Sequence, residues 1–129
     1  MKSLVRLLLG IAGLLALAAA LMLWIHPELA APRLGLATTN ITGLATIRAD
    51  IGGFFAVSGV FAVLAAIRGE ARYAAAVLAL QFFAVSGRIV NVLLSGWNDQ
   101  LMPPIAIEIT VIVICIAAWR TLGEERVQR

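Results

Sequence analysis

Long apolar runs broken by short polar segments dominate the hydrophobic pattern of this chain. Four runs stand out, at about residues 5–25, 43–67, 73–95 and 103–120. Each is close to the ~20 residues that a helix needs to cross the hydrocarbon core of a bilayer. The breaks between them carry glycine, proline and charged residues, and short breaks favour antiparallel neighbours. The pattern predicts an all-α fold, in which an integral membrane four-helix bundle forms one domain over residues 1–129.

Composition supports a membrane protein over a water-soluble one. Of the 129 residues, 62% are hydrophobic and 13% are charged, so a soluble domain of this size would lack polar residues to cover its surface. The ten basic residues are spread over helix ends, which excludes a basic face for nucleic acid. The single cysteine, Cys115, excludes an intramolecular disulfide and a cysteine metal cluster. We expect no cofactor and no metal.

The first apolar run has an alternative interpretation as a cleaved signal peptide. It follows Lys2 and Arg6 and contains a run of three alanines, Ala18–Ala20, which resembles a cleavage site. The apolar run continues past these alanines to Ile25, which makes it longer than the usual signal-peptide core. We therefore expect a retained helix.

Basic residues also predict the orientation of the bundle. One set of helix ends carries most of them, whereas the other set has only Arg33 and Arg48. Because basic residues accumulate on the cytoplasmic side, we expect both termini in the cytoplasm. The residues behind this prediction are Lys2, Arg6, Arg68, Arg72, Arg120, Arg126 and Arg129.

Small residues at helical spacing predict where helices pack closely. Helices in lipid associate through small side chains and interhelical hydrogen bonds rather than through the hydrophobic effect. Stripes of this kind occur in the first run (Gly10, Gly13, Leu17, Ala20, Trp24) and in the second (Arg48, Gly52, Phe55, Gly59, Ala62, Ala66). The second run also shares the hexapeptide of residues 54–59 with residues 82–87 of the third, a repeat that we interpret as coincidence because the two helices run in opposite directions.

A polar stripe in the third run supplies the candidate site. Gln81, Arg88 and Asn91 fall within an arc of about 80° on an otherwise apolar helix. An arginine near the membrane centre costs at least ~2.5 kcal/mol, so Arg88 needs a partner or a hydrated cavity. Glu108 in the fourth run lies at a similar depth, and Arg48 begins the second run on the same side. We expect these charges to converge in the outer half of the bundle.

Two interpretations of this cluster remain open. In the first, Arg48, Arg88 and Glu108 neutralise one another and fix which helices meet. In the second, the extra guanidinium group, with Gln81 and Asn91, binds an anionic or polar head group from the outer leaflet, since arginine forks suit carboxylate and phosphate.

The chain resembles the bacterial membrane family catalogued as domain of unknown function 4345, and more loosely the DoxX-like four-helix group. The resemblance rests on three segments: Leu34-Gly35-Leu36, Arg48-Ala49-Asp50-Ile51-Gly52-Gly53 and Gly87-Arg88. It implies four helices in a bacterial inner membrane and no known activity.

The leading functional hypothesis is a non-catalytic, multi-pass inner-membrane protein that binds a small amphiphile or lipid head group, or serves as an accessory subunit. The alternative is a small transporter or proton-coupled carrier that uses the same charges. An enzyme is disfavoured because Cys115 has no histidine nearby to activate it. Expected partners are the bilayer, a lipid or small amphiphile and, given the small size of the bundle, further copies of the chain.

Overall fold

Helices make up all of the regular secondary structure in residues 1–37 and 40–123, which the computed structural model describes. Four helical segments are long and apolar enough to cross a membrane, namely Lys2–Ile25, Ile41–Arg68, Ala71–Ser95 and Asp99–Gly123. They coincide with the four predicted runs to within a few residues at each end. The predicted all-α fold with four membrane-capable helices is confirmed.

The break after the first span is itself helical. α1 (Lys2–Ile25) ends at His26, and α2 (Pro27–Ala30) and the 3-10 helix η1 (Ala31–Leu34) follow directly. Proline at the first position of α2 suits a helix start, because an N–H at that position would have no acceptor within the helix and proline carries none. The sequence pattern had indicated only a turn here.

The second span is built from three segments that run on without a break. α3 (Ile41–Thr46) is followed by the π-helical segment η2 (Ile47–Gly52) and by α4 (Gly53–Arg68). The Asn40 side chain caps α3 by accepting a hydrogen bond of 2.7 Å from the backbone N–H of Gly43. A π-helical turn is rare and often marks a functional position, and this one contains Arg48.

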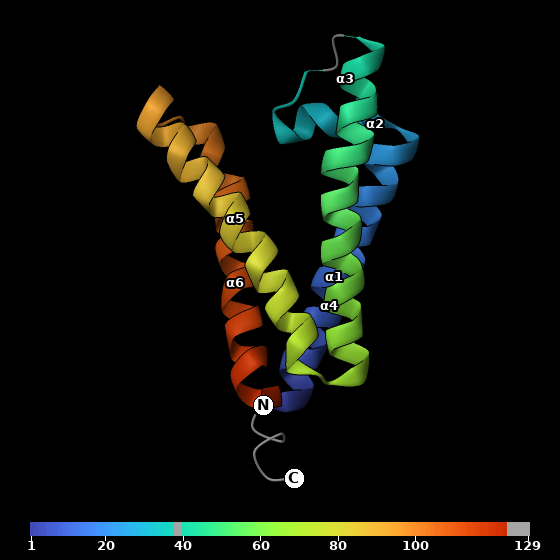
Figure 1. Cartoon of the computed structure of the whole chain (residues 1–129), viewed down its shortest axis with the longest axis vertical. Helices are drawn as coiled ribbons and strands as arrows, with labels where there is room; N and C mark the ends of the chain where they lie inside the picture. The colour runs from blue at the N-terminus through green and yellow to red at the C-terminus, as the bar shows by residue number, and fades with distance from the viewer. Residues whose placement is uncertain (38–39, 124–129) are drawn as a thin grey trace.

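The last two spans form the second hairpin. α5 (Ala71–Ser95) rises from the loop at Gly69, and the 3-10 helix η3 (Asp99–Leu101) leads into α6 (Met102–Gly123). Gly69 has φ 65°, a left-handed conformation that ends α4 and lets the chain reverse. In Figure 1, successive long helices run up, down, up and down.

The predicted small-residue stripes of the first two spans face each other. A Cβ placed on Gly13 would lie 2.9 Å from the Gly59 carbonyl oxygen, and one placed on Gly59 would lie 2.8 Å from the Gly13 carbonyl oxygen. Gly10 lies against Ala66 farther along the same seam. Side chains larger than hydrogen are therefore excluded where α1 crosses α4, and the two backbones approach closely.

In the part of the chain that the structure describes, the four long helices share a core at one end. The shared core contains buried residues from all four spans: Val5, Leu9, Ala62, Ala65, Ala74, Val77, Cys115, Ala118 and Leu122. A second, smaller core (Leu23, Ala31, Ile47) involves only the hairpin of the first two spans, called the first hairpin below, and the segment that connects them. Figure 1 accordingly shows the α1–α4 pair and the α5–α6 pair close together near the N terminus and diverging toward the other end.

Candidate functional site

The centre of the candidate site is an ion pair between the helices of the second hairpin. The Arg88 Nε on α5 donates to both carboxylate oxygens of Glu108 on α6, at 2.8 and 2.9 Å. The Glu108 side chain is 11% exposed and the Arg88 side chain 32%. Because both helices are membrane-capable, the pair removes most of the cost of placing either charge in an apolar environment.

The rest of the Arg88 guanidinium group remains open. Within the described residues, its two terminal nitrogens, Nη1 and Nη2, donate to no protein atom, and only Nε is engaged. These nitrogens carry four N–H donors in the planar fork that suits a phosphate or carboxylate group. The pair therefore has unused binding capacity although its two charges cancel.

Gln81 and Asn91 occupy the same side of α5 as Arg88 but differ in burial. Gln81 is buried at 8% exposure, whereas Asn91 is exposed. Tyr73, near the start of α5, stacks on Phe61 of α4 at 6.1 Å between ring centroids. Asn91 follows Tyr73 by about five helical turns and so shares its side of α5, at a level beyond the shared core. Within the described residues, neither amide side chain hydrogen-bonds to another residue.

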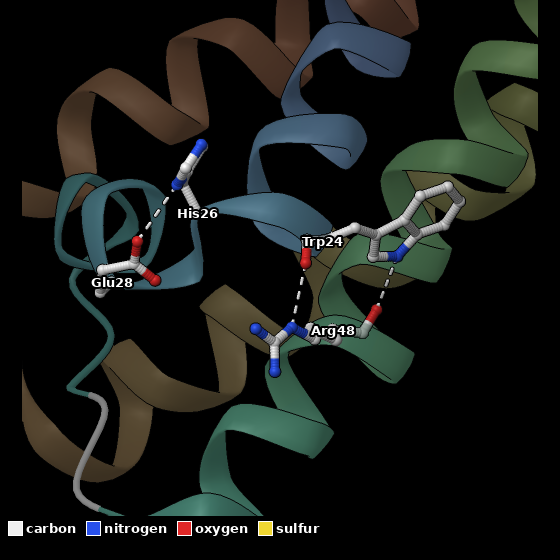
Figure 2. A network of polar contacts seen from close by, with 4 residues as sticks. All are labelled: Trp24, His26, Glu28 and Arg48. Atoms are coloured by element: carbon white, nitrogen blue, oxygen red, sulfur yellow. Dashed lines mark hydrogen bonds and ion pairs between the residues drawn. The ribbon is translucent and has the colours of Figure 1, made fainter.

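Arg48 does not join this pair. Its Nε donates 3.0 Å to the Trp24 carbonyl oxygen, and the Trp24 indole Nε1 donates 2.9 Å to the Arg48 carbonyl oxygen. Figure 2 shows these two reciprocal bonds between α1 and η2. No hydrogen bond or ion pair links Arg48 to Arg88 or Glu108 in the described part of the chain. The expected convergence of the three charges is absent because Arg48 belongs to the first hairpin.

The local structure explains why Arg48 turns toward α1. Trp24 lies in the last turn of α1, where carbonyl groups lack helical partners and the helix dipole favours a cation. A Cβ placed on Gly52, one turn after Arg48, would lie 2.5 Å from the Trp24 indole nitrogen. Gly52 thus provides the space for the indole ring. This contact explains why the 48–53 segment carries Arg48 and Gly52.

Arg6 makes the matching contact at the other end of the same hairpin, a contact that was not predicted from the sequence. Its Nε donates 2.6 Å to the Ala66 carbonyl oxygen and its Nη2 donates 2.7 Å to the Ile67 carbonyl oxygen, both in the last turn of α4. Each helix of the first hairpin therefore supplies an arginine to the C-terminal carbonyls of the other. The sequence signal was available, since Arg6 and Arg48 stand at opposite ends of the two small-residue stripes.

A contact between two polar side chains, His26 and Glu28, lies near Arg48 in the connection after α1. His26 Nδ1 and Glu28 Oε1 are 3.3 Å apart (Figure 2). A hydrogen bond from the backbone N–H of Glu28, at the start of α2, is the main cause that lowers the pKa of the Glu28 carboxyl. Partial desolvation opposes this shift, and His26 and Arg48 each lower the pKa by a smaller amount. This carboxylate is ionised at neutral pH and partly balances the exposed Arg48.

An apolar groove runs beside Arg88 along the α5–α6 hairpin. Its volume is about 230 Å³, below the ~300–1,000 Å³ of a drug-sized ligand pocket. The lining residues are Val85, Arg88, Ile89, Val92, Leu93, Trp97 and Ile105.

No constellation for a metal ion is found in the described residues, where no three histidine, cysteine, aspartate or glutamate side chains gather. Cys115 is fully buried in the shared core, away from the Arg88–Glu108 pair along α6. The groups at this site with unused hydrogen-bonding capacity are the Arg88 terminal nitrogens, which suit a polar or anionic group.

Comparison with known proteins identifies a family without assigning an activity. No curated protein and no solved structure is significantly similar to the chain. The model of one family matches residues 4–119, which is nearly the whole chain. On that match, the chain belongs to the family described as Domain of unknown function (DUF4345).

Proposed function

We propose that this chain is a non-catalytic, multi-pass protein of a bacterial inner membrane that holds the polar head of a small amphiphile at Arg88. One observation carries the proposal: Glu108 fixes the guanidinium group through Nε alone, while Nη1 and Nη2 stay open beside an apolar groove. A head group with phosphate or carboxylate oxygens would accept from these nitrogens. The apolar tail would lie along the groove toward Trp97.

In this proposal the two termini and the α4–α5 loop face the cytoplasm, because the basic residues gather at that end of the helices. The diverging end of the two hairpins then lies in the outer half of the membrane, together with Arg88. An amphiphile would enter from the outer leaflet between lipid-exposed faces, without crossing the shared core.

Mass spectrometry of lipids that co-purify with the protein tests the binding. We expect the wild-type protein to retain an acidic amphiphile that Arg88→Ala loses, and Arg88→Lys to retain it poorly because lysine lacks the fork. Arg48→Ala is the matched control, since it removes the same charge from the first hairpin. Identical lipid profiles for wild type and Arg88→Ala would sink the proposal.

A second candidate, a proton-coupled carrier, is favoured by the open end of the bundle. A core shared by all four helices closes one end, and a buried carboxylate, Glu108, lies toward the other. Protonation of Glu108 would release Arg88 and could be linked to transport. Flux of candidate amphiphiles into liposomes tests this function: pH-dependent flux that Glu108→Gln leaves unchanged, or no flux at all, would exclude it.

A further inference from the structure

Two arginines converge on one tyrosine hydroxyl at the loop between α4 and α5. Arg68 Nη1 lies 3.3 Å and Arg72 Nη2 lies 3.2 Å from the Tyr73 hydroxyl oxygen. The guanidinium carbon of Arg72 lies 4.9 Å from the centre of the Tyr73 ring, and that of Arg68 lies 6.0 Å from it. The tyrosine thus holds two like charges near each other, partly through cation–π attraction.

A third guanidinium group lies beside the same loop. Arg6 is anchored on the Ala66 and Ile67 carbonyl oxygens, and its Nη1 lies 3.7 Å from a Cβ placed on Gly69. Glu70 is the acidic side chain at the loop, and it pairs with Arg72 at 2.7 Å. Among these four described residues, three positive charges therefore meet one negative charge.

Arg68 is the group that this arrangement leaves without a carboxylate. Within the described residues its side chain bonds only to Tyr73, which accepts both arginine hydrogen bonds and keeps its own O–H free to donate. The loop joins two membrane-capable helices and so lies at the level of lipid head groups, where tyrosine rings also prefer to sit. An anion at this position would have guanidinium forks on two sides and a hydroxyl donor between them.

We propose that Arg68, Arg72 and Tyr73 form a binding site for the phosphate of an anionic phospholipid, such as phosphatidylglycerol, in the leaflet that contacts the α4–α5 loop. The terminal nitrogens of both arginines donate to phosphate oxygens, and the Tyr73 hydroxyl donates to a third. The anion relieves the repulsion among Arg6, Arg68 and Arg72. A bilayer supplies this anion at high local concentration, which favours a lipid over a soluble phosphate. This site is independent of Arg88, which lies at the diverging end of the bundle.

Native mass spectrometry of the full chain in neutral detergent tests the site, with phosphatidylglycerol as the probe and phosphatidylcholine and inorganic phosphate as comparisons. Since each basic residue near an anionic surface contributes about 1 kcal/mol, Arg68→Gln/Arg72→Gln should bind phosphatidylglycerol roughly 30-fold more weakly. Arg33→Gln/Arg120→Gln removes the same number of charges elsewhere and should lose only a few-fold. Tyr73→Phe keeps the ring and should weaken binding by a smaller factor.

The outcomes separate a specific site from general surface charge. Stronger retention of phosphatidylglycerol than of phosphatidylcholine, lost selectively in the Arg68 and Arg72 variant, supports the site. Equal losses in both double variants, equal binding of the two lipids, or equally tight binding of inorganic phosphate would overturn it. Maleimide labelling checks that each variant is folded, because the buried Cys115 should stay unlabelled in a folded protein. If the double variant is unfolded, Tyr73→Phe decides, and unchanged binding there overturns the site.

Discussion

Replacing Glu108 by leucine should destabilise the protein more than replacing both members of its ion pair. In the native chain, Arg88 Nε donates to both Glu108 oxygens and the Arg88 side chain is about two-thirds buried, at 32% exposure. An unpaired arginine at the centre of a membrane helix costs at least ~2.5 kcal/mol. Allowing for its partial exposure, Glu108→Leu should lower the free energy of unfolding by about 2 kcal/mol.

The double variant Arg88→Leu/Glu108→Leu should be much milder. Replacing a buried ion pair by hydrophobic residues of similar volume is often neutral or stabilising. We therefore expect the double variant to unfold within ~1 kcal/mol of wild type, with a favourable coupling between the two positions. This coupling should approach the maximum of ~1.7 kcal/mol for polar contacts between membrane helices rather than their average of ~0.6 kcal/mol, because both carboxylate oxygens are engaged.

Unfolding in mixed micelles with increasing denaturing detergent would measure these differences. Cys115 provides a native reporter, since its thiol is buried where all four helices meet and becomes reactive only when the shared core opens. A single variant as stable as wild type, or a double variant as unstable as Glu108→Leu, would refute the view that the pair compensates two buried charges.

Three further predictions address other parts of the molecule. Gly59→Ala should destabilise the α1–α4 crossing by ~1–3 kcal/mol, because its Cβ would lie 2.8 Å from the Gly13 carbonyl oxygen and 2.9 Å from the Leu17 backbone nitrogen. An added Cβ on Gly53 has nothing within 4 Å, so Gly53→Ala should be neutral in the same unfolding measurement. Gly52→Ala should displace the Trp24 indole from the Arg48 carbonyl and shift its fluorescence, and an unchanged spectrum would contradict the contact. The lowered pKa of Glu28 means that its stabilising contribution is present above the ordinary carboxyl pKa and is lost as the pH falls through the lowered value. The difference in stability between wild type and Glu28→Gln should therefore disappear in acid, and a pH-independent difference would contradict this.

The sequence was sufficient for the spans and for the close interface between α1 and α4. Apolar run length depends on bilayer thickness, so hydropathy alone located four helices. The glycine stripes located the α1–α4 seam because only small residues allow that approach, and Gly13 and Gly59 meet as expected. The depth match between Arg88 and Glu108 also led to an ion pair that the structure contains.

The position of Arg48 could not be predicted from depth. Two residues at equal depth meet only if their helices are neighbours at that height, and the hairpins diverge there. Trp24, at one end of its stripe, and Gly52, one turn along from Arg48, were the signal for the alternative partner. The π-helical turn at 47–52 was also missed, because hydropathy does not reveal an extra residue within a helical turn.

The repeated hexapeptide shows how little local sequence determines packing here. Gly59, at the end of the first copy, lies at the helix crossing, whereas Gly87, at the end of the second, has nothing within 4 Å of an added Cβ. The same six residues therefore serve one close interface and one open face. What differs is the partner helix, which no local pattern specifies.

The two crossed arginine contacts of the first hairpin set the register of α1 against α4. Sliding one helix along the other by a single turn, about 5.4 Å, would pull Arg6 from the Ala66 and Ile67 carbonyls and Arg48 from the Trp24 carbonyl at the same time. A shear motion inside this hairpin is thus opposed at both ends. We therefore expect a large conformational change to rotate the α5–α6 hairpin as a rigid body relative to the first hairpin, about the shared core.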